Sequence, residues 1–242
     1  MKVAILAGGK GTRLSELTKS VPKPMVKIGG KPILVHIINI YLNYGFKDFY
    51  LLVGFKSHII KKYFKNFKKS GQSFKFVSKK KTCNITIIDS GKNSMTGGRL
   101  KKINKYLNKD EDFMFTYGDG VSNINIKKLI RFHKKNKKMI TVTAVRPPAR
   151  FGEIIIKKNL VQSFKEKPQV AQGWINGGFF ISKSVFLDYI RNSKTILEKN
   201  PLEKVAKQKQ LSVFKHYNFW KCMDTLRDKN ELEKIYKKNK FK

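Results

Sequence analysis

The chain reads Leu6-Ala7-Gly8-Gly9-Lys10-Gly11-Thr12-Arg13-Leu14 where a short apolar run ends. The apolar run, Lys2–Leu6, has the length and composition of a first β-strand. Glycines at its end allow backbone N–H groups to approach phosphate oxygens, because no Cβ atom stands in the way. Arg13 can add bidentate hydrogen bonds to outer phosphates. The spacing differs from the dinucleotide motif GxGxxG and from the Walker motif, so we predict a phosphate-binding loop of another type.

Strand-like and helix-like segments alternate from this loop to about residue 145. The predicted strands are Lys2–Leu6, Phe49–Val53, Ile85–Ile88, Phe113–Tyr117 and Ile140–Val145. Helices are predicted from Pro32 to Gly45, from a capping Ser57 onward, around Arg99–Leu107, and at Ile126–Asn136. This alternation favours an α/β fold, with a Rossmann-like mixed, mostly parallel sheet flanked by helices.

The pattern changes after Pro147-Pro148. Two short segments, Gly152–Ile156 and Val161–Phe164, predict a hairpin that would form a small β lobe. Further predicted elements are a strand at Trp174–Ile181, a helix at Ser184–Arg191, a strand at Leu211–His216 and a closing helix from Thr225. We expect one domain over residues 1–242, composed of 1–145, 146–224 and a C-terminal helix at 225–242.

The chain is strongly basic, with 53 Lys and Arg against 16 Asp and Glu and a formal net charge of +37. Few of these cations are arginines, and the lysines are spread along the whole chain. Base recognition favours the Arg fork, so we expect no specific nucleic-acid partner. The charge would still concentrate small anionic substrates near the protein.

Only two cysteines are present, Cys83 and Cys222, far apart in the sequence. They match no disulfide framework and no zinc-ligand spacing. The longest apolar-rich stretch, Ile33–Leu42, is too short to span a bilayer. We therefore expect a cytoplasmic protein without membrane association.

Three further segments accompany the glycine-rich loop in a fixed order. Pro22-Lys23-Pro24-Met25 follows it closely, a hydrophobic strand ends in Gly118-Asp119, and the C-terminal part reads Phe219-Trp220-Lys221-Cys222-Met223-Asp224-Thr225-Leu226-Arg227-Asp228. From Met1 to about Lys229, the chain resembles the sugar nucleotidyltransferase family. The resemblance implies the nucleotide-diphospho-sugar transferase fold. It also implies that 1–145 mainly bind the nucleotide and 146–224 mainly the sugar.

The resemblance assigns the central charged residues. Arg13 and Lys23 are implied to be catalytic, with Lys23 near the α-phosphate. Asp119 and Asp224 are implied to hold Mg²⁺, a cation that needs only one or two protein carboxylates besides phosphate oxygens and water. Asp224 has an alternative role as the cap of the last helix.

Sugar-phosphate contacts are implied by two other motifs. Phe164-Lys165-Glu166-Lys167-Pro168 matches the family's EKP, and Gly173-Trp174-Ile175-Asn176-Gly177-Gly178-Phe179-Phe180 resembles its INGGFF. A weaker match, Pro147-Pro148-Ala149-Arg150-Phe151-Gly152, adds one arginine. The implied sugar-phosphate ligands are Arg150, Glu166, Lys167, Asn176 and Gly177.

The segment Ser94-Met95-Thr96-Gly97-Gly98-Arg99-Leu100 resembles the version found in the cytidylyltransferase branch. Cytosine presents O2 and N3 as adjacent acceptors, which suits an Arg fork. With the glycine-rich loop, the implied nucleotide contacts are Leu6, Ala7, Gly8, Gly9, Lys10, Gly11, Thr12, Arg13, Ser94, Thr96, Gly98, Arg99 and Gly118.

The resemblance thus implies a Mg²⁺-dependent enzyme that uses CTP and glucose 1-phosphate to make CDP-glucose and pyrophosphate. Such a product would serve cell-surface polysaccharide or O-antigen synthesis. Alternatives are another nucleoside triphosphate or another sugar phosphate, and a catalytically silent nucleotide-sugar sensor or regulatory subunit. A nucleic-acid-binding protein is motivated by charge alone. The oligomeric state, including a homo-oligomer, stays open.

Overall fold

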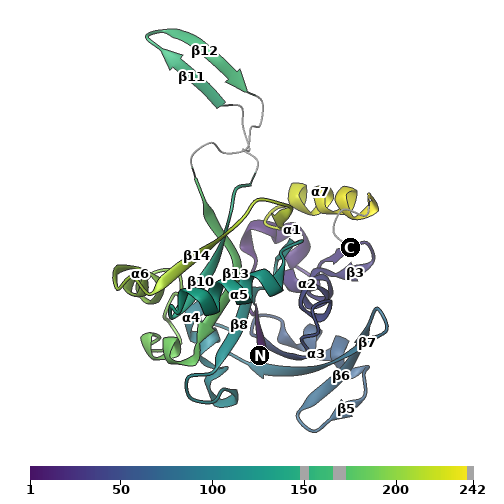
Figure 1. Ribbon diagram of the computed structural model, residues 1–242. Helices are drawn as coiled ribbons and strands as arrows, with labels where there is room; N and C mark the ends of the chain where they lie inside the picture. Colours follow the sequence, from purple (N-terminus) through teal and green to yellow (C-terminus); the bar gives the residue numbers. More distant parts are fainter. Residues whose placement is uncertain (148–152, 166–172, 239–242) are drawn as a thin grey trace.

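A nine-stranded sheet forms the centre of the protein, as a computed structural model shows for residues 1–147, 153–165 and 173–238 (Figure 1). The strand order is β14-β10-β13-β8-β1-β4-β7-β6-β5. In chain order these strands are β1 (Val3–Ala7), β4 (Asp48–Val53), β5 (Lys69–Ser70), β6 (Ser73–Ser78), β7 (Lys81–Asp89), β8 (Asp112–Tyr117), β10 (Ile140–Val145), β13 (Ile175–Lys183) and β14 (Leu211–His216). Parallel pairing joins β8, β1, β4 and β7, whereas β13 runs antiparallel between β8 and β10. This confirms the predicted mixed, mostly parallel sheet.

Helices cover both faces of the sheet, which explains the continuous apolar composition of its central strands. The helices are α1 (Ser15–Thr18), α2 (Ile33–Leu42), α3 (Ser57–Lys65), α4 (Thr96–Lys101), α5 (Ile126–Asn136), α6 (Asn200–Lys207) and α7 (Leu226–Lys237). Short 3-10 helices are η1 (Thr12–Leu14), η2 (Lys23–Met25), η3 (Asn104–Tyr106) and η4 (Ser184–Tyr189).

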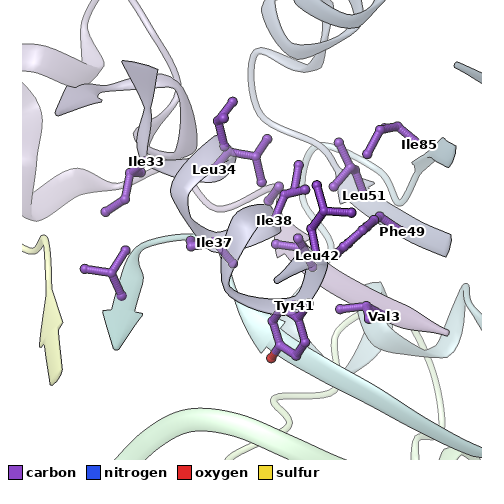
Figure 2. Packing of buried hydrophobic residues seen from close by; sticks show 14 of the residues in the cluster. Val3, Ile33, Leu34, Ile37, Ile38, Tyr41, Leu42, Phe49, Leu51 and Ile85 are labelled. Atoms are coloured by element: carbon purple, nitrogen blue, oxygen red, sulfur yellow. The ribbon is translucent and has the colours of Figure 1, made fainter. Parts of the chain in front are cut away.

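Strand β1 shows how the two faces are built. Its residues Val3, Ile5 and Ala7 belong to the core cluster that contains α2, whereas Ala4 and Leu6 belong to the cluster on the other face. Successive side chains of a strand point to opposite faces, so this short strand contributes to both cores. Figure 2 shows α2 packing through Leu34, Ile38 and Leu42 toward the strand residues Phe49, Leu51 and Ile85.

Three small pairings complete the described structure. These are β2 (Lys27–Ile28) with β3 (Lys31–Pro32), β9 (Gly120–Ser122) with β15 (Trp220–Cys222), and β11 (Glu153–Lys157) with β12 (Leu160–Lys165). The β11–β12 hairpin matches the predicted β lobe and lies apart from the sheet (Figure 1). In the described part of the chain, no helix has both the length and the apolarity needed to cross a membrane.

Several sequence-based boundaries change. Ser57 does not cap α3 with its side chain, because Lys56 is the N-cap residue and makes no such hydrogen bond. The helix predicted around Arg99–Leu107 is divided into α4 and η3, and the helix predicted at Ser184–Arg191 is the shorter 3-10 helix η4. The sheet strand β6 and helix α6 were not predicted, although Phe74 and Phe76 alternate with polar residues in β6 and Leu202 and Val205 lie three positions apart in α6.

Candidate functional site

A cleft of about 250 Å³ opens at the carboxyl ends of β1 and β8. The chain leaves β1 toward β4 on one side and returns through β8 on the other. Ligands of open α/β sheets bind at such a switch point. The cleft is lined by Leu6, Gly9, Gly11, Thr12, Arg13, Lys23, Pro24, Thr96, Arg99, Tyr117, Gly118 and Asp119.

The glycine-rich loop is shaped by close backbone packing. A Cβ atom on Gly8 would overlap the guanidinium of Arg99 and lie 2.8 Å from the Gly54 nitrogen. Gly11 has a left-handed backbone with φ 64°, and its Cβ would lie 3.1 Å from the Cβ of Lys23. Both positions therefore require glycine for space or conformation. Ala7 is fully buried and Lys10 is exposed; neither lines the cleft.

Lys23 forms the charged centre of the site. Its Nζ lies 2.6 Å from Oδ2 of Asp119 and 2.6 Å from Oδ1 of Asp224. The other oxygen of Asp224 accepts from Arg13 Nη1 at 2.9 Å. Four residues that sequence reasoning singled out are thus in direct contact, although up to 211 positions separate them.

Local structure explains how the carboxylates come together. Strand β15 pairs with β9 so that Cys222 faces Gly120, and the Met223 N–H donates to the Asp119 carbonyl at 2.9 Å. The two aspartates therefore lie at adjoining ends of a two-stranded ladder. Asp224 is not the cap of α7, because Thr225 fills that role in a capping box with Asp228. This arrangement leaves the Asp224 carboxylate for Lys23 and Arg13.

The cluster shifts the pKa values of its members. Burial alone would lower the pKa of Lys23, but the carboxylates of Asp119 and Asp224 raise it above 10.5. Burial alone would raise the pKa of Asp224, but the contacts with Lys23 and Arg13 hold it below 3.8. Both residues are therefore charged at neutral pH.

The shifted pKa of Asp224 predicts an acid-labile contribution to stability. Because the folded-state pKa is below the unfolded value, this stabilisation is present above pH 3.8 and is lost as pH falls through the folded value. We expect Asp224→Asn to reduce the slope of unfolding free energy against pH below about pH 4. Urea unfolding at a series of pH values measures this slope. The exposed Asp188→Asn variant is the control, and an unchanged slope for Asp224→Asn would contradict the expectation.

The donor set fits a small hard cation. Two carboxylates converge on one cationic atom at 2.6 Å, and Mg²⁺ prefers one or two carboxylates together with phosphate oxygens and water. Among the described residues, no group of three or more His, Cys, Asp or Glu offers a closed cage. Asp119 and Asp224 would thus hold the metal together with a phosphate-bearing ligand.

The 94–100 segment packs between the glycine-rich loop and residues 192–197. A Cβ atom on Gly98 would overlap the Ser193 backbone, which accounts for that glycine by packing. Ser94 Oγ donates to the Ser90 carbonyl. The buried Arg99 guanidinium donates to Ser90 Oγ, the Gly91 carbonyl at 2.8 Å and the Lys92 carbonyl at 3.3 Å. Thr96 and Arg99 line the cleft, whereas Ser94 and Gly98 do not.

The predicted sugar side is described only in part, because Arg150, Glu166 and Lys167 lie outside the described residues. Asn176 Nδ2 donates to the Tyr117 hydroxyl at 3.1 Å, next to the cleft. A Cβ atom on Gly177 would lie within 3 Å of the Val145 side chain and of the Thr143 carbonyl. The Gly177 carbonyl accepts a hydrogen bond from Trp220 Nε1 at 2.7 Å. Asn176 thus borders the cleft, and Gly177 is tightly packed.

Sequence reasoning missed Tyr117, Pro24 and Glu198 as site residues. Tyr117 directly precedes Gly118-Asp119, Pro24 directly follows Lys23, and both line the cleft. Glu198 accepts from the Tyr117 hydroxyl at 2.7 Å and from the Thr96 hydroxyl at 2.6 Å, so one carboxylate joins the two sides of the cleft. Burial and this carboxylate raise the pKa of Tyr117, which keeps its hydroxyl protonated. No local pattern around Glu198 marks it.

Comparisons with known proteins find relatives over nearly the whole chain. The family model described as nucleotidyl transferase matches residues 2–231. The glucose-1-phosphate cytidylyltransferase of Salmonella typhimurium is 47% identical over 250 residues, covering 99% of this chain and 97% of that protein. A probable glucose-1-phosphate cytidylyltransferase of Bacillus subtilis is 38% identical, with 98% and 96% coverage. The crystal structure of HddC from Yersinia pseudotuberculosis complexed with GMP-PN shares the fold, with a TM-score of 0.73, 23% identity, and coverage of 97% and 99%.

Proposed function

Because this chain belongs to the nucleotidyl transferase family, we propose that it transfers the cytidylyl group of CTP to glucose 1-phosphate, giving CDP-glucose and pyrophosphate. The chain is an enzyme of the nucleotidyltransferase class. The observation that carries the reaction type is the convergence of Lys23, Asp119, Asp224 and Arg13 beside a glycine-rich loop. The choice of CTP and glucose 1-phosphate rests on the Salmonella relative.

In the proposed reaction, a phosphate oxygen of glucose 1-phosphate attacks the α-phosphorus of CTP in line. A new P–O bond forms as the bond to the β-phosphate oxygen breaks, and pyrophosphate leaves with the bonding electrons. Lys23 and Arg13 offset the charge that develops on the phosphoryl oxygens and the leaving group. When bound by Asp119 and Asp224, Mg²⁺ would supply further charge neutralisation and orient the phosphates.

The protonated thiol of Cys222 is consistent with direct attack on the α-phosphorus, without a covalent enzyme intermediate. It lies in β15, and its Sγ is 3.6 Å from Asp224 Oδ2. Burial, followed by the nearby charges of Asp224 and Asp119, raises its pKa to about 12. The nucleophilic form of cysteine is the thiolate, so at neutral pH this side chain is a poor nucleophile. The nearest cysteine to the carboxylates is thus no candidate for a covalent intermediate.

The remaining assignments complete the proposal. The glycine-rich loop contributes backbone N–H groups to the triphosphate, and Thr96 and Arg99 form the base side. Asn176, with Arg150, Glu166 and Lys167, binds the sugar phosphate. We propose a cytoplasmic enzyme whose product supplies O-antigen or another cell-surface polysaccharide.

A matrix of substrates tests this function. Pyrophosphate release is measured with CTP, UTP, dTTP, GTP or ATP against glucose 1-phosphate and mannose 1-phosphate, with and without Mg²⁺. We expect metal-dependent turnover with CTP and glucose 1-phosphate, and a preference over other bases of at least about tenfold. A preference for another triphosphate or sugar keeps the nucleotidyltransferase class and overturns the proposed substrates. Binding of CDP-glucose without any turnover would indicate a silent sensor.

A further inference from the structure

Residues 8–19 have few contacts of their own that would hold them in place. Gly9, Lys10, Thr12 and Arg13 are exposed, whereas Gly8, Leu14 and Thr18 are buried. Contacts from outside hold the segment at the Arg13–Asp224 ion pair and at the connection between β4 and α3. There the Phe55 N–H donates to the Gly8 carbonyl at 3.0 Å, at the start of the loop.

Lys56 contacts the other end of the same segment. Its Nζ donates to the Thr18 carbonyl at 2.9 Å and to the Lys19 carbonyl. These carbonyls end α1, where backbone acceptors lack partners within the helix and a cation is favourable. Lys56 thus donates hydrogen bonds to the free carbonyls at the end of α1, the helix that follows the loop with Arg13.

Thr18 extends this contact back into the loop. Its hydroxyl donates to the Leu14 carbonyl at 3.0 Å and lies 3.2 Å from the Gly11 carbonyl. Gly11 in turn packs against Lys23. A continuous set of contacts therefore runs from Lys56 through Thr18 to the glycine-rich loop and the charged centre.

The backbone conformation of Lys56 makes glycine a suitable test substitution at this position. Lys56 has φ 50° and ψ 35°, a left-handed conformation that glycine adopts more easily than other residues. It is the N-cap of α3, but its side chain makes no capping hydrogen bond there and reaches α1 instead.

We propose that Lys56 is a positioning residue for the nucleotide. Its ammonium fixes the end of α1 and, through Thr18, holds the loop with Arg13 in the conformation that receives the triphosphate. This inference rests on the proposed function for its effect on CTP, whereas its effect on the loop is independent of that function.

Hydrogen–deuterium exchange measures the loop directly. In Lys56→Met and Lys56→Gly, we expect amides of residues 9–19 to exchange about fivefold faster or more, since a charge-assisted contact is lost. Lys56→Gly removes the contact while suiting the left-handed backbone, so it stays folded. Lys56→Arg should remain near wild type. Lys137, with φ 51° at the end of α5, provides matched controls in Lys137→Met and Lys137→Gly.

Steady-state kinetics measure the consequence. We expect KM for CTP to rise about tenfold in Lys56→Met and Lys56→Gly, because small misplacements of binding groups are costly. KM for glucose 1-phosphate should stay within about twofold, and Lys56→Arg should recover most of the loss. The inference would be overturned if amides of residues 9–19 exchanged in Lys56→Gly as fast as in the wild type. Equal changes in KM for CTP and for glucose 1-phosphate would also overturn it. If the wild-type protein has no activity, the proposed function is wrong. The exchange measurement would then still test whether Lys56 holds the loop.

Discussion

Replacing Lys23 by Met is expected to lower the turnover number by about 10²–10³ while the protein stays folded. The ammonium lies 2.6 Å from both carboxylates and at the wall of the cleft, so it is placed to stabilise charge on a transferring phosphoryl group. Methionine keeps much of the aliphatic volume of this buried side chain but removes the charge. Single-turnover measurements with CTP and glucose 1-phosphate separate the chemical step from product release.

The control for this variant is Lys27→Met, four residues further along. Lys27 is exposed in β2, and the substitution removes the same charge from the protein without touching the cleft. We expect Lys27→Met to keep wild-type turnover within about twofold. Equal losses in the two variants would reduce the role of Lys23 to its contribution to net charge. Near-normal turnover in a folded Lys23→Met protein would remove the catalytic assignment.

Replacing Asp119 by Asn should weaken metal binding about tenfold or more and reduce turnover by about 10² or more. Asp119 and Asp224 are the carboxylates that converge on one cationic centre, and Asn halves the negative charge available there. Electron paramagnetic resonance with Mn²⁺ in place of Mg²⁺ measures this binding. An unreactive CTP analogue with a methylene group between the α- and β-phosphorus atoms supplies the triphosphate.

Asp89 provides a matched control for Asp119. It ends β7 at the same edge of the sheet, but it pairs with Lys61 and accepts from the Gly91 N–H. We expect Asp89→Asn to bind Mn²⁺ with the affinity of the wild type. If Asp119→Asn also keeps wild-type affinity, the metal role proposed for this carboxylate is wrong.

The sequence predicted the sheet and the charged centre for the same physical reason. Strands β1 and β8 are apolar runs followed by the glycine-rich loop and by Asp119. Because the strands are parallel, their carboxyl ends lie at the same edge of the sheet. The sequence therefore predicts that the glycine-rich loop and Asp119 lie together. Asp224 could be assigned to the site only from the family resemblance. The short β9–β15 ladder that brings it to Asp119 has no recognisable sequence period.

Other parts of the site depend on contacts that no local pattern carries. Gly98 was predicted as a nucleotide contact, and the structure gives it a packing reason, the close approach of Ser193 from 95 positions away. Glu198 joins Thr96 and Tyr117 across the cleft from a segment without a motif. Lys56 is one lysine among many in the sequence, and its contact with the carbonyls at the end of α1 depends on tertiary structure. Such residues are specified by tertiary structure.

The most direct test of the account follows the α-phosphorus of CTP. Wild-type protein is incubated with CTP carrying ³²P at that atom, glucose 1-phosphate and Mg²⁺, and the radioactive products are separated by thin-layer chromatography beside standards. The account predicts that the label appears in CDP-glucose and that the pyrophosphate is unlabelled. Label that stays in CTP, while another nucleoside triphosphate or sugar phosphate is converted, would contradict it.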